Sequence, residues 1–149
     1  MSSTTAAGTG IEISAAAPAS QDAAGYTALT YTEIGGVEQL GAIGATTNKV
    51  EFQPLKGPKD KHKGSTDYGS LQPAIAHDPE DAGQTLLRTA AEPDNNALYS
   101  FRVTYATGDK RYFQGRVFGY PETTGNADSI LMANPTIEIT KKIVKDDAA

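Results

Sequence analysis

Residues 97–119 have the sequence ALYSFRVTYATGDKRYFQGRVFG. Within residues 99–105, large apolar side chains alternate with polar ones, which is the period-two pattern of a β-strand with one buried face. Residues 107–109 (Thr-Gly-Asp) are of the types that reverse a chain. The strand that follows places Phe113 and Val117 on one face and polar residues on the other. The stretch therefore predicts a β-hairpin.

Downstream of this hairpin, residues 120–126 predict a second loop, and residues 129–144 predict a further strand. Ile137 and Ile139 alternate with polar residues, so they are expected to face the core. Pro135 lacks a backbone N–H and marks an edge or a bulge in this strand.

Upstream of the hairpin, residues 65–76 predict a strand and the residues after it predict a helix. Asp78 is expected to cap the helix and Pro79 to occupy its first position. An apolar stripe at helical spacing follows within residues 82–90, and Pro93 ends the helix. One short helix is therefore expected to pack on a sheet.

The run of residues 46–53 also alternates, with Val50 and Phe52 on one face, and predicts a half-buried strand. Residues 54–64 then contain four lysines, two prolines and two glycines, which predicts a long, protruding hairpin loop. Its lysines require either solvent or an anionic partner. Both interpretations of the loop remain open at this point.

Residues 1–28 are rich in Ala, Ser, Thr and Gly and hold few large apolar side chains. Such a segment buries too little apolar surface to offset its ordering entropy, so we expect an arm that is mobile in the isolated subunit. The arm is either a disordered tail or a segment that orders on a partner. Residues 29–149 are expected to form a single, mainly β domain with one short flanking helix.

The composition excludes several classes of function. The 149 residues include no cysteine and no tryptophan, and 13 lysines and arginines against 18 acids give a net charge of −5. Without cysteine there is no disulfide, thiolate nucleophile or cysteine-containing zinc site. The negative charge disfavours general binding of nucleic acid. The first residues lack the basic start and apolar run of a secretory signal, and no apolar run is long enough to predict a membrane span. We therefore expect a soluble protein made in the cytoplasm with no membrane partner.

No pattern of catalytic residues is present either. His62 and His77 lack the spacing of a metal site, and the order Lys-Gly-Ser at residues 63–65 is the reverse of a phosphate-binding loop. We therefore predict no catalytic, cofactor-binding or metal-binding residue, and a structural or binding protein rather than an enzyme. A carbohydrate-binding β-sandwich is an alternative, although the absence of tryptophan gives it little support.

The order of these features resembles the major tail tube protein of long-tailed, lambda-like bacteriophages. The resemblance spans residues 31–145 and is most specific in residues 97–119 and in the closing stretch TIEITKKIVK. It implies a β-sandwich or barrel-like core, six-membered rings that stack into a hollow tube, and passage of the genome through the tube during ejection. The alternatives within this class are a tail terminator or connector and a tube protein of a phage-derived secretion device.

The resemblance also implies a place in the virion and a set of partners. Synthesis is expected in the cytoplasm of the host bacterium and assembly into the tail tube. The partners are further copies of the chain and the tape measure, tail tip and terminator proteins, while phage DNA passes through the lumen without specific binding. An acidic lumen suits that passage because it does not retard a polyanion.

Two sets of residues follow from this interpretation. The candidates for contacts between subunits are the loop lysines, expected to meet the acidic N-terminal arm of another copy: Lys56, Lys59, Lys61 and Lys63. The candidates that face the lumen are polar residues of the predicted strands: Thr47, Glu51, Gln114 and Glu138. Lys49, Arg102 and Arg116 share these strand faces, and their charge opposes an acidic lumen.

Overall fold

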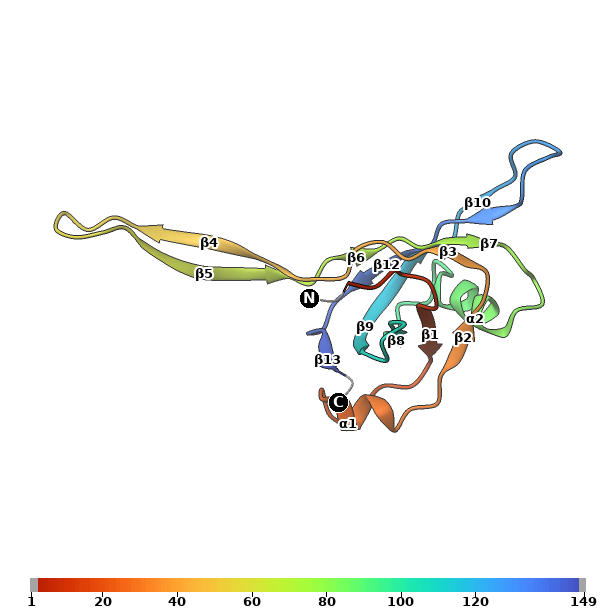
Figure 1. Ribbon diagram of the computed structural model, residues 1–149, viewed down its shortest axis with the longest axis horizontal. Helices are drawn as coiled ribbons and strands as arrows, with labels where there is room; N and C mark the ends of the chain where they lie inside the picture. Colours follow the sequence, from red (N-terminus) through yellow and green to blue (C-terminus); the bar gives the residue numbers. More distant parts are fainter. Residues whose placement is uncertain (1–2, 148–149) are drawn as a thin grey trace.

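The computed structural model describes residues 3–147 as a mainly β fold with three antiparallel sheets and two short helices (Figure 1). The seven-stranded sheet contains β1 (Gly10–Ser14), β2 (Thr32–Ile34), β6 (Ser70–Leu71), β8 (Tyr99–Thr104), β9 (Lys110–Gly119), β12 (Thr136–Ile139) and β13 (Val144–Asp146). The four-stranded sheet contains β3 (Val37–Gln39), β7 (Ala74–Ala76), β10 (Glu122–Thr123) and β11 (Met132–Ala133). The remaining elements are the β4–β5 hairpin (Thr46–Phe52 and Asp60–Asp67) and the helices α1 (Ala23–Thr27) and α2 (Ala82–Ala90).

The β8–β9 hairpin lies inside the seven-stranded sheet, whose order is β2-β1-β8-β9-β12-β6, with β13 also paired to β9. Phe101 is paired with Phe113, and their rings stack with centroids 5.3 Å apart. The turn between the strands contains Gly108 with a φ of 95°, a conformation that favours glycine. The hairpin and its predicted face assignment are confirmed.

One face of this sheet carries the main core. Phe101, Phe113 and Ile137 are fully buried there and pack in one cluster with Leu87 of α2. The helix approaches β2 very closely, because a Cβ atom on Gly83 would lie 2.0 Å from the carbonyl oxygen of Glu33. Glycine is therefore required for α2 to cover this face.

The first strand lies within residues 1–28, the segment predicted to be an arm that is mobile in the isolated subunit. Residues 10–14 form β1, which is inserted between β2 and β8 and pairs with both. Ile11 and Ile13 are fully buried in the main core. The composition of residues 1–28 indicates much less buried apolar surface than this segment has, because its two isoleucines lie in the middle of a sheet.

The opposite face of the sheet is covered by the segment between β1 and β2. Tyr26 of α1 is fully buried and stacks on Tyr112 with ring centroids 5.3 Å apart. The Gln21 side chain donates a hydrogen bond of 2.9 Å to the side-chain oxygen of Gln114. Ser100 Oγ donates a 2.7 Å bond to the carbonyl of Ala16. The central strands are consequently removed from water on both faces.

The start of α2 differs from the prediction. The N-cap is Asp81, whose carboxylate accepts a 2.9 Å hydrogen bond from the backbone N–H of Gln84 and a 3.1 Å bond from that of Gly35. Asp78 instead accepts from the N–H of Glu80 in the turn that precedes the helix. Both aspartates suit a cap by residue type, and the contact with Gly35, distant in sequence, favours Asp81.

Two predicted strands are also divided. The strand expected over residues 65–76 consists of the end of β5, then β6 and β7, which lie in three different sheets. The strand expected over residues 129–144 is split into β11 and β12, with Pro135 between them; β12 ends at Ile139, and Val144 begins β13. Ile137 and Ile139 are buried as expected, with 0% and 6% of their surface exposed.

Replacing Ile13 with alanine is expected to lower the free energy of unfolding by about 2–5 kcal/mol, because the change leaves a cavity in the packed core. Ile130, which is 71% exposed, supplies the matched control. Ile130→Ala is expected to change the free energy of unfolding by less than about 0.5 kcal/mol. Urea denaturation of the dilute subunit measures both variants. Equally small effects would show that residues 1–28 are a mobile arm in the isolated subunit.

Candidate assembly interface

The β4–β5 hairpin projects away from the rest of the molecule (Figure 1). Its strands pair only with each other, and cross-strand pairs place their side chains on the same side. Val50 pairs with His62 and Phe52 with Asp60, which defines one face. Lys49 pairs with Lys63, and Glu51 with Lys61, which defines the other. We call these the apolar face and the charged face of the hairpin.

The apolar face is uncovered in the subunit. Val50 is 52% exposed and Phe52 is 62% exposed, while Leu55 near the tip is fully exposed. The predicted alternation of residues 46–53 is confirmed, but the expected half-burial is wrong within one subunit because no other element reaches this face. An apolar face of this kind requires a partner to remove it from water.

The charged face is basic. Glu51 forms ion pairs with Lys49, at 2.7 Å, and with Lys59, at 3.4 Å, so its own charge is compensated. Residues 49–63 contain five lysines and two acids, which leaves eight lysines and arginines against sixteen acids in the rest of the chain. The hairpin is thus a positive projection on a negative body.

The segment after β9 forms a second projection, on the side of the molecule away from the hairpin (Figure 1). Phe118 is 68% exposed and Ile130 is 71% exposed. Between them lie two exposed acids, Glu122 and Asp128, and residues 117–140 contain no lysine, arginine or histidine. This projection is therefore acidic, with large apolar side chains at its surface. We call residues 118–131 the acidic end.

The sheets also end in open edges. The outermost strands are β2 and β6 in the seven-stranded sheet and β10 and β3 in the four-stranded sheet. An edge strand presents backbone N–H and carbonyl groups that another chain can pair with. The subunit therefore offers several edges for contacts between copies.

The cover of the second sheet face contains a cluster of tyrosines around Arg102. Its guanidinium lies 4.5 Å from the centroid of the Tyr31 ring and forms a bidentate ion pair with Glu12 of β1. Burial raises the pKa of Tyr26 to about 12, and burial together with neighbouring Tyr112 raises that of Tyr31 further. These contacts hold the segment between β1 and β2 onto the sheet.

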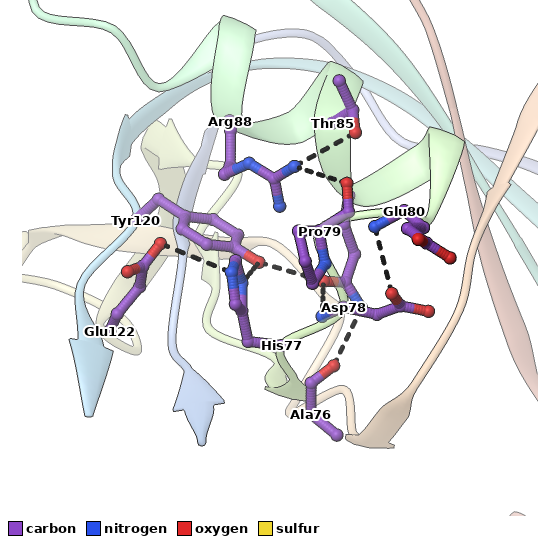
Figure 2. Close-up of polar contacts among 10 residues, drawn as sticks. Ala76, His77, Asp78, Pro79, Glu80, Thr85, Arg88, Tyr120 and Glu122 are labelled. Carbon is purple, nitrogen blue, oxygen red and sulfur yellow. Dashed lines mark hydrogen bonds and ion pairs between the residues drawn. The ribbon is translucent and has the colours of Figure 1, made fainter. Parts of the chain in front are cut away.

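A second polar cluster surrounds the fully buried side chain of Gln84. Figure 2 labels its partners Ala76, Asp78 and Tyr120. The amide nitrogen of Gln84 donates to the carbonyls of Gly35 and Ala76, at 2.8 and 2.9 Å. Its oxygen accepts from the N–H of Asp78 at 2.8 Å and from the Tyr120 hydroxyl at 3.2 Å. All four hydrogen-bonding positions are thus satisfied, and the residue fastens α2 to the ends of β2 and β7.

Figure 2 places His77 beside Tyr120 in the same cluster. His77 Nδ1 lies 3.3 Å from the Tyr120 hydroxyl, and His77 Nε2 lies 3.9 Å from the Glu122 carboxylate. Arg88 donates to Thr85 and packs over the Tyr120 ring. The contacts are those of a structural network that links α2 to the base of the acidic end.

A groove of about 880 Å³ lies between residues 4–9 and residues 37–43. Glu38 and Tyr105 are its ionisable lining residues, and no nucleophile is paired with a base there. Within residues 3–147, no group of three or more His, Asp or Glu side chains could hold a metal ion. In the same part of the chain, no helix is long and apolar enough to cross a membrane.

The residues proposed from the sequence are distributed unevenly. Lys56 and Lys59 lie at the hairpin turn, but Lys61 and Lys63 lie in strand β5 rather than in a loop. The loop prediction for residues 54–64 is thus too long, because an exposed two-stranded ladder accommodates lysines on its solvent faces. All four lysines nevertheless belong to the β4–β5 hairpin.

The candidates for a lumen surface are also separated. Thr47 and Glu51 lie on β4, where Thr47 contacts Thr66 across the hairpin. Glu138 is half-buried on β12, in register with Arg116. Gln114 is only 3% exposed under the segment between β1 and β2, so its side chain has no free surface in the subunit.

The acidic end is absent from the residues proposed from the sequence. Phe118 belongs to β9, as the sequence predicted, but the sequence pattern did not indicate that its side chain is exposed. The signal that was available is the absence of any basic residue over residues 117–140.

Several solved structures share this fold. A chain from the sheath/tube terminator of the PVC extracellular contractile injection system, in its extended state, has a TM-score of 0.68 at 7% identity and covers 98% of each chain. A chain from the 6-fold symmetrised baseplate of the anti-feeding prophage (AFP) has a TM-score of 0.68 at 7% identity, over 99% of this chain and 98% of that one. The SPP1 tail tube has a TM-score of 0.63 at 11% identity, over 94% of this chain and 77% of its own.

These similarities show that the chain has a tail-tube-type β fold, as the sequence predicted. No protein-family model matches the sequence, and no curated protein matches it. The fold is therefore recognised through its three-dimensional arrangement at identities of 7–11%.

The stability of the subunit is expected to fall as the pH rises from about 10 to 12. Tyrosine ionises near pH 10 in an unfolded chain, whereas burial raises the pKa of Tyr26 to about 12, so the unfolded state loses its proton first and is favoured. Urea midpoints across this range measure the effect. Tyr26→Phe is expected to make the fall shallower, whereas Tyr68→Phe, outside the cluster, serves as the control. An unchanged slope in Tyr26→Phe would contradict the assignment.

Proposed function

We propose that the chain is a structural, non-enzymatic subunit of a tail tube, and that copies of it form six-membered rings that stack into a tube for genome passage in a long-tailed phage. The observation that carries the proposal is the fold shared with the SPP1 tail tube over 94% of this chain. The open sheet edges and the uncovered hairpin support it, because pairing between copies removes both from water. The 6-fold symmetry of the AFP assembly supports rings of six.

In this proposal the virion tail is the location of the assembled protein, after synthesis in the host cytoplasm. Further copies of the chain are its main partner, with the tape measure, tail tip and terminator proteins at the ends and along the tube. Phage DNA is not bound specifically.

A second candidate is a terminator or a tube protein of a contractile injection device. The specific observation in its favour is the length of the match. The match covers 98% of the chain from the PVC sheath/tube terminator structure but 77% of the SPP1 tail tube chain. A terminator forms single rings and does not extend them. The two candidates thus differ in whether rings stack.

The acidic lumen is part of the same proposal. The body of the subunit has twice as many acids as basic residues once residues 49–63 are set aside. Glu138 on β12 is the acidic candidate on the body, while Thr47 and Glu51 lie on the basic hairpin, where Lys49 and Lys59 compensate the charge of Glu51. An acidic lumen is therefore expected to be lined by the body of the ring, with the hairpins directed elsewhere.

Negative-stain electron microscopy of the concentrated protein across a range of salt is the direct test. Stacked hollow tubes are expected for a tube subunit, and single rings for a terminator. If neither forms alone, the measurement is repeated with tail-tip complexes as nuclei, because a subunit that requires nucleation stays monomeric. The absence of rings and tubes in both experiments would refute the proposal.

We further propose that Lys56, Lys59, Lys61 and Lys63 contact an acidic surface of another copy. Lys61→Ser/Lys63→Ser is expected to reduce assembly and to weaken its dependence on salt, because fewer opposite charges then meet across the interface. Lys141→Ser/Lys142→Ser is the matched control, since it removes two exposed lysines outside the hairpin. Sedimentation of assemblies at several salt concentrations measures both. Equal behaviour of the two variants would exclude Lys61 and Lys63 from the interface.

A further inference from the structure

Two projections carry all the large apolar side chains that are exposed within residues 3–147. Three belong to the β4–β5 hairpin and two to the acidic end: Val50, Phe52, Leu55, Phe118 and Ile130. Their exposed fractions range from 52% to complete exposure. Exposed apolar side chains that gather in this way mark an interaction surface rather than scattered residues.

The two projections cannot bury each other's apolar side chains within one subunit. Figure 1 shows the hairpin and the β10–β11 loop extending in different directions from opposite sides of the sheets. Each surface therefore requires a second molecule. If the two surfaces are complementary, that second molecule is another copy of this chain.

Their charges are complementary. Residues 49–63 contain five lysines and two acids, whereas the acidic end contains Glu122 and Asp128 and no basic residue. On the hairpin, Lys61 and Lys63 lie on the face opposite Val50 and Phe52. These two lysines point away from a surface that meets the apolar face. Lys56 and Lys59, at the turn beside Leu55, are the lysines that can face acids at the border of the contact without being buried.

We propose that the apolar face and tip of the hairpin of one copy dock on the acidic end of a second copy. The inference deepens the proposed function, on which it rests for a second copy as the partner. The contact joins two different surfaces, so it is heterologous and head to tail. Repeated contacts of this type form a closed ring when their rotation closes and an open filament when it does not.

The chain contains no cysteine, so single introduced cysteines report this contact without interference. Leu55→Cys, carrying a size tag, is mixed with untagged Ile130→Cys and treated with a short bismaleimide crosslinker. The expected product is the mixed dimer, formed at several times the yield obtained when Leu55→Cys is mixed with Thr89→Cys. Thr89 is exposed on α2, outside residues 49–63 and 118–131, and is the matched control.

Charge reversal tests the orientation of the contact. Lys56→Glu/Lys59→Glu, added to the Leu55→Cys chain, is expected to lower the mixed yield with Ile130→Cys several-fold. Asp128→Lys, added to the Ile130→Cys chain, is expected to restore part of it, because opposite charges then meet again. Asp128→Lys alone is expected to lower the yield with the unmodified hairpin. A loss without restoration would overturn the assignment of the acidic end.

The outcome also separates this inference from the proposed function. Rings or tubes of the wild-type protein with no preferential crosslink overturn the docking contact and leave the tube function intact. A preferential crosslink without rings or tubes supports the contact and contradicts the tube function. If neither assembly nor a preferential crosslink is observed at the highest soluble concentration with nuclei present, both the docking contact and the tube function are overturned.

Discussion

The central pair of strands, β8 and β9, must be kept from water on both faces, and the other elements are arranged to meet this requirement. On one face the cover is α2, with Leu87 in the main core. On the other face the cover is the segment between β1 and β2, with Tyr26 stacked on Tyr112. Because a sheet face with large apolar residues needs a second layer, both covers are necessary for the fold. Both come from the same chain, and neither extends over the β4–β5 hairpin.

The hairpin therefore has little within its own subunit to hold its conformation. A two-stranded hairpin alone in water is marginally stable. Its additional contacts are exposed and polar, such as the bond of 2.9 Å between Asn48 and Ser65 and the ion pairs of Glu51. Exposed ion pairs contribute about 0–1 kcal/mol each. In the proposed docking contact, burial of Val50 and Phe52 against a second copy supplies the additional free energy that fixes the hairpin.

The sequence was informative where a strand is buried by its immediate neighbours and less informative where a distant segment provides the cover. The alternation in residues 46–53 and 99–105 correctly predicted which side chains share a face of β4 and of β8, respectively. In contrast, Gln114 is polar and was expected to be exposed, but Gln21, 93 residues away, covers it. Strand β1 was missed because its five residues follow a run of small residues, although the spacing of Ile11 and Ile13 was the available signal.

In the proposed docking contact, the base of the hairpin sets the direction in which one copy reaches the next. The hairpin leaves the body beside Gly69, whose φ of 86° favours glycine. The carbonyl of Gly69 accepts a 3.0 Å bond from the N–H of Ile139 on β12, and its own N–H donates to Asp67 at 2.9 Å. The direction of the hairpin is thus tied to the seven-stranded sheet. In the proposed head-to-tail contact, the rotation between successive copies follows from this direction. The base of the hairpin then sets the ring size, and the apolar face sets the strength of the contact.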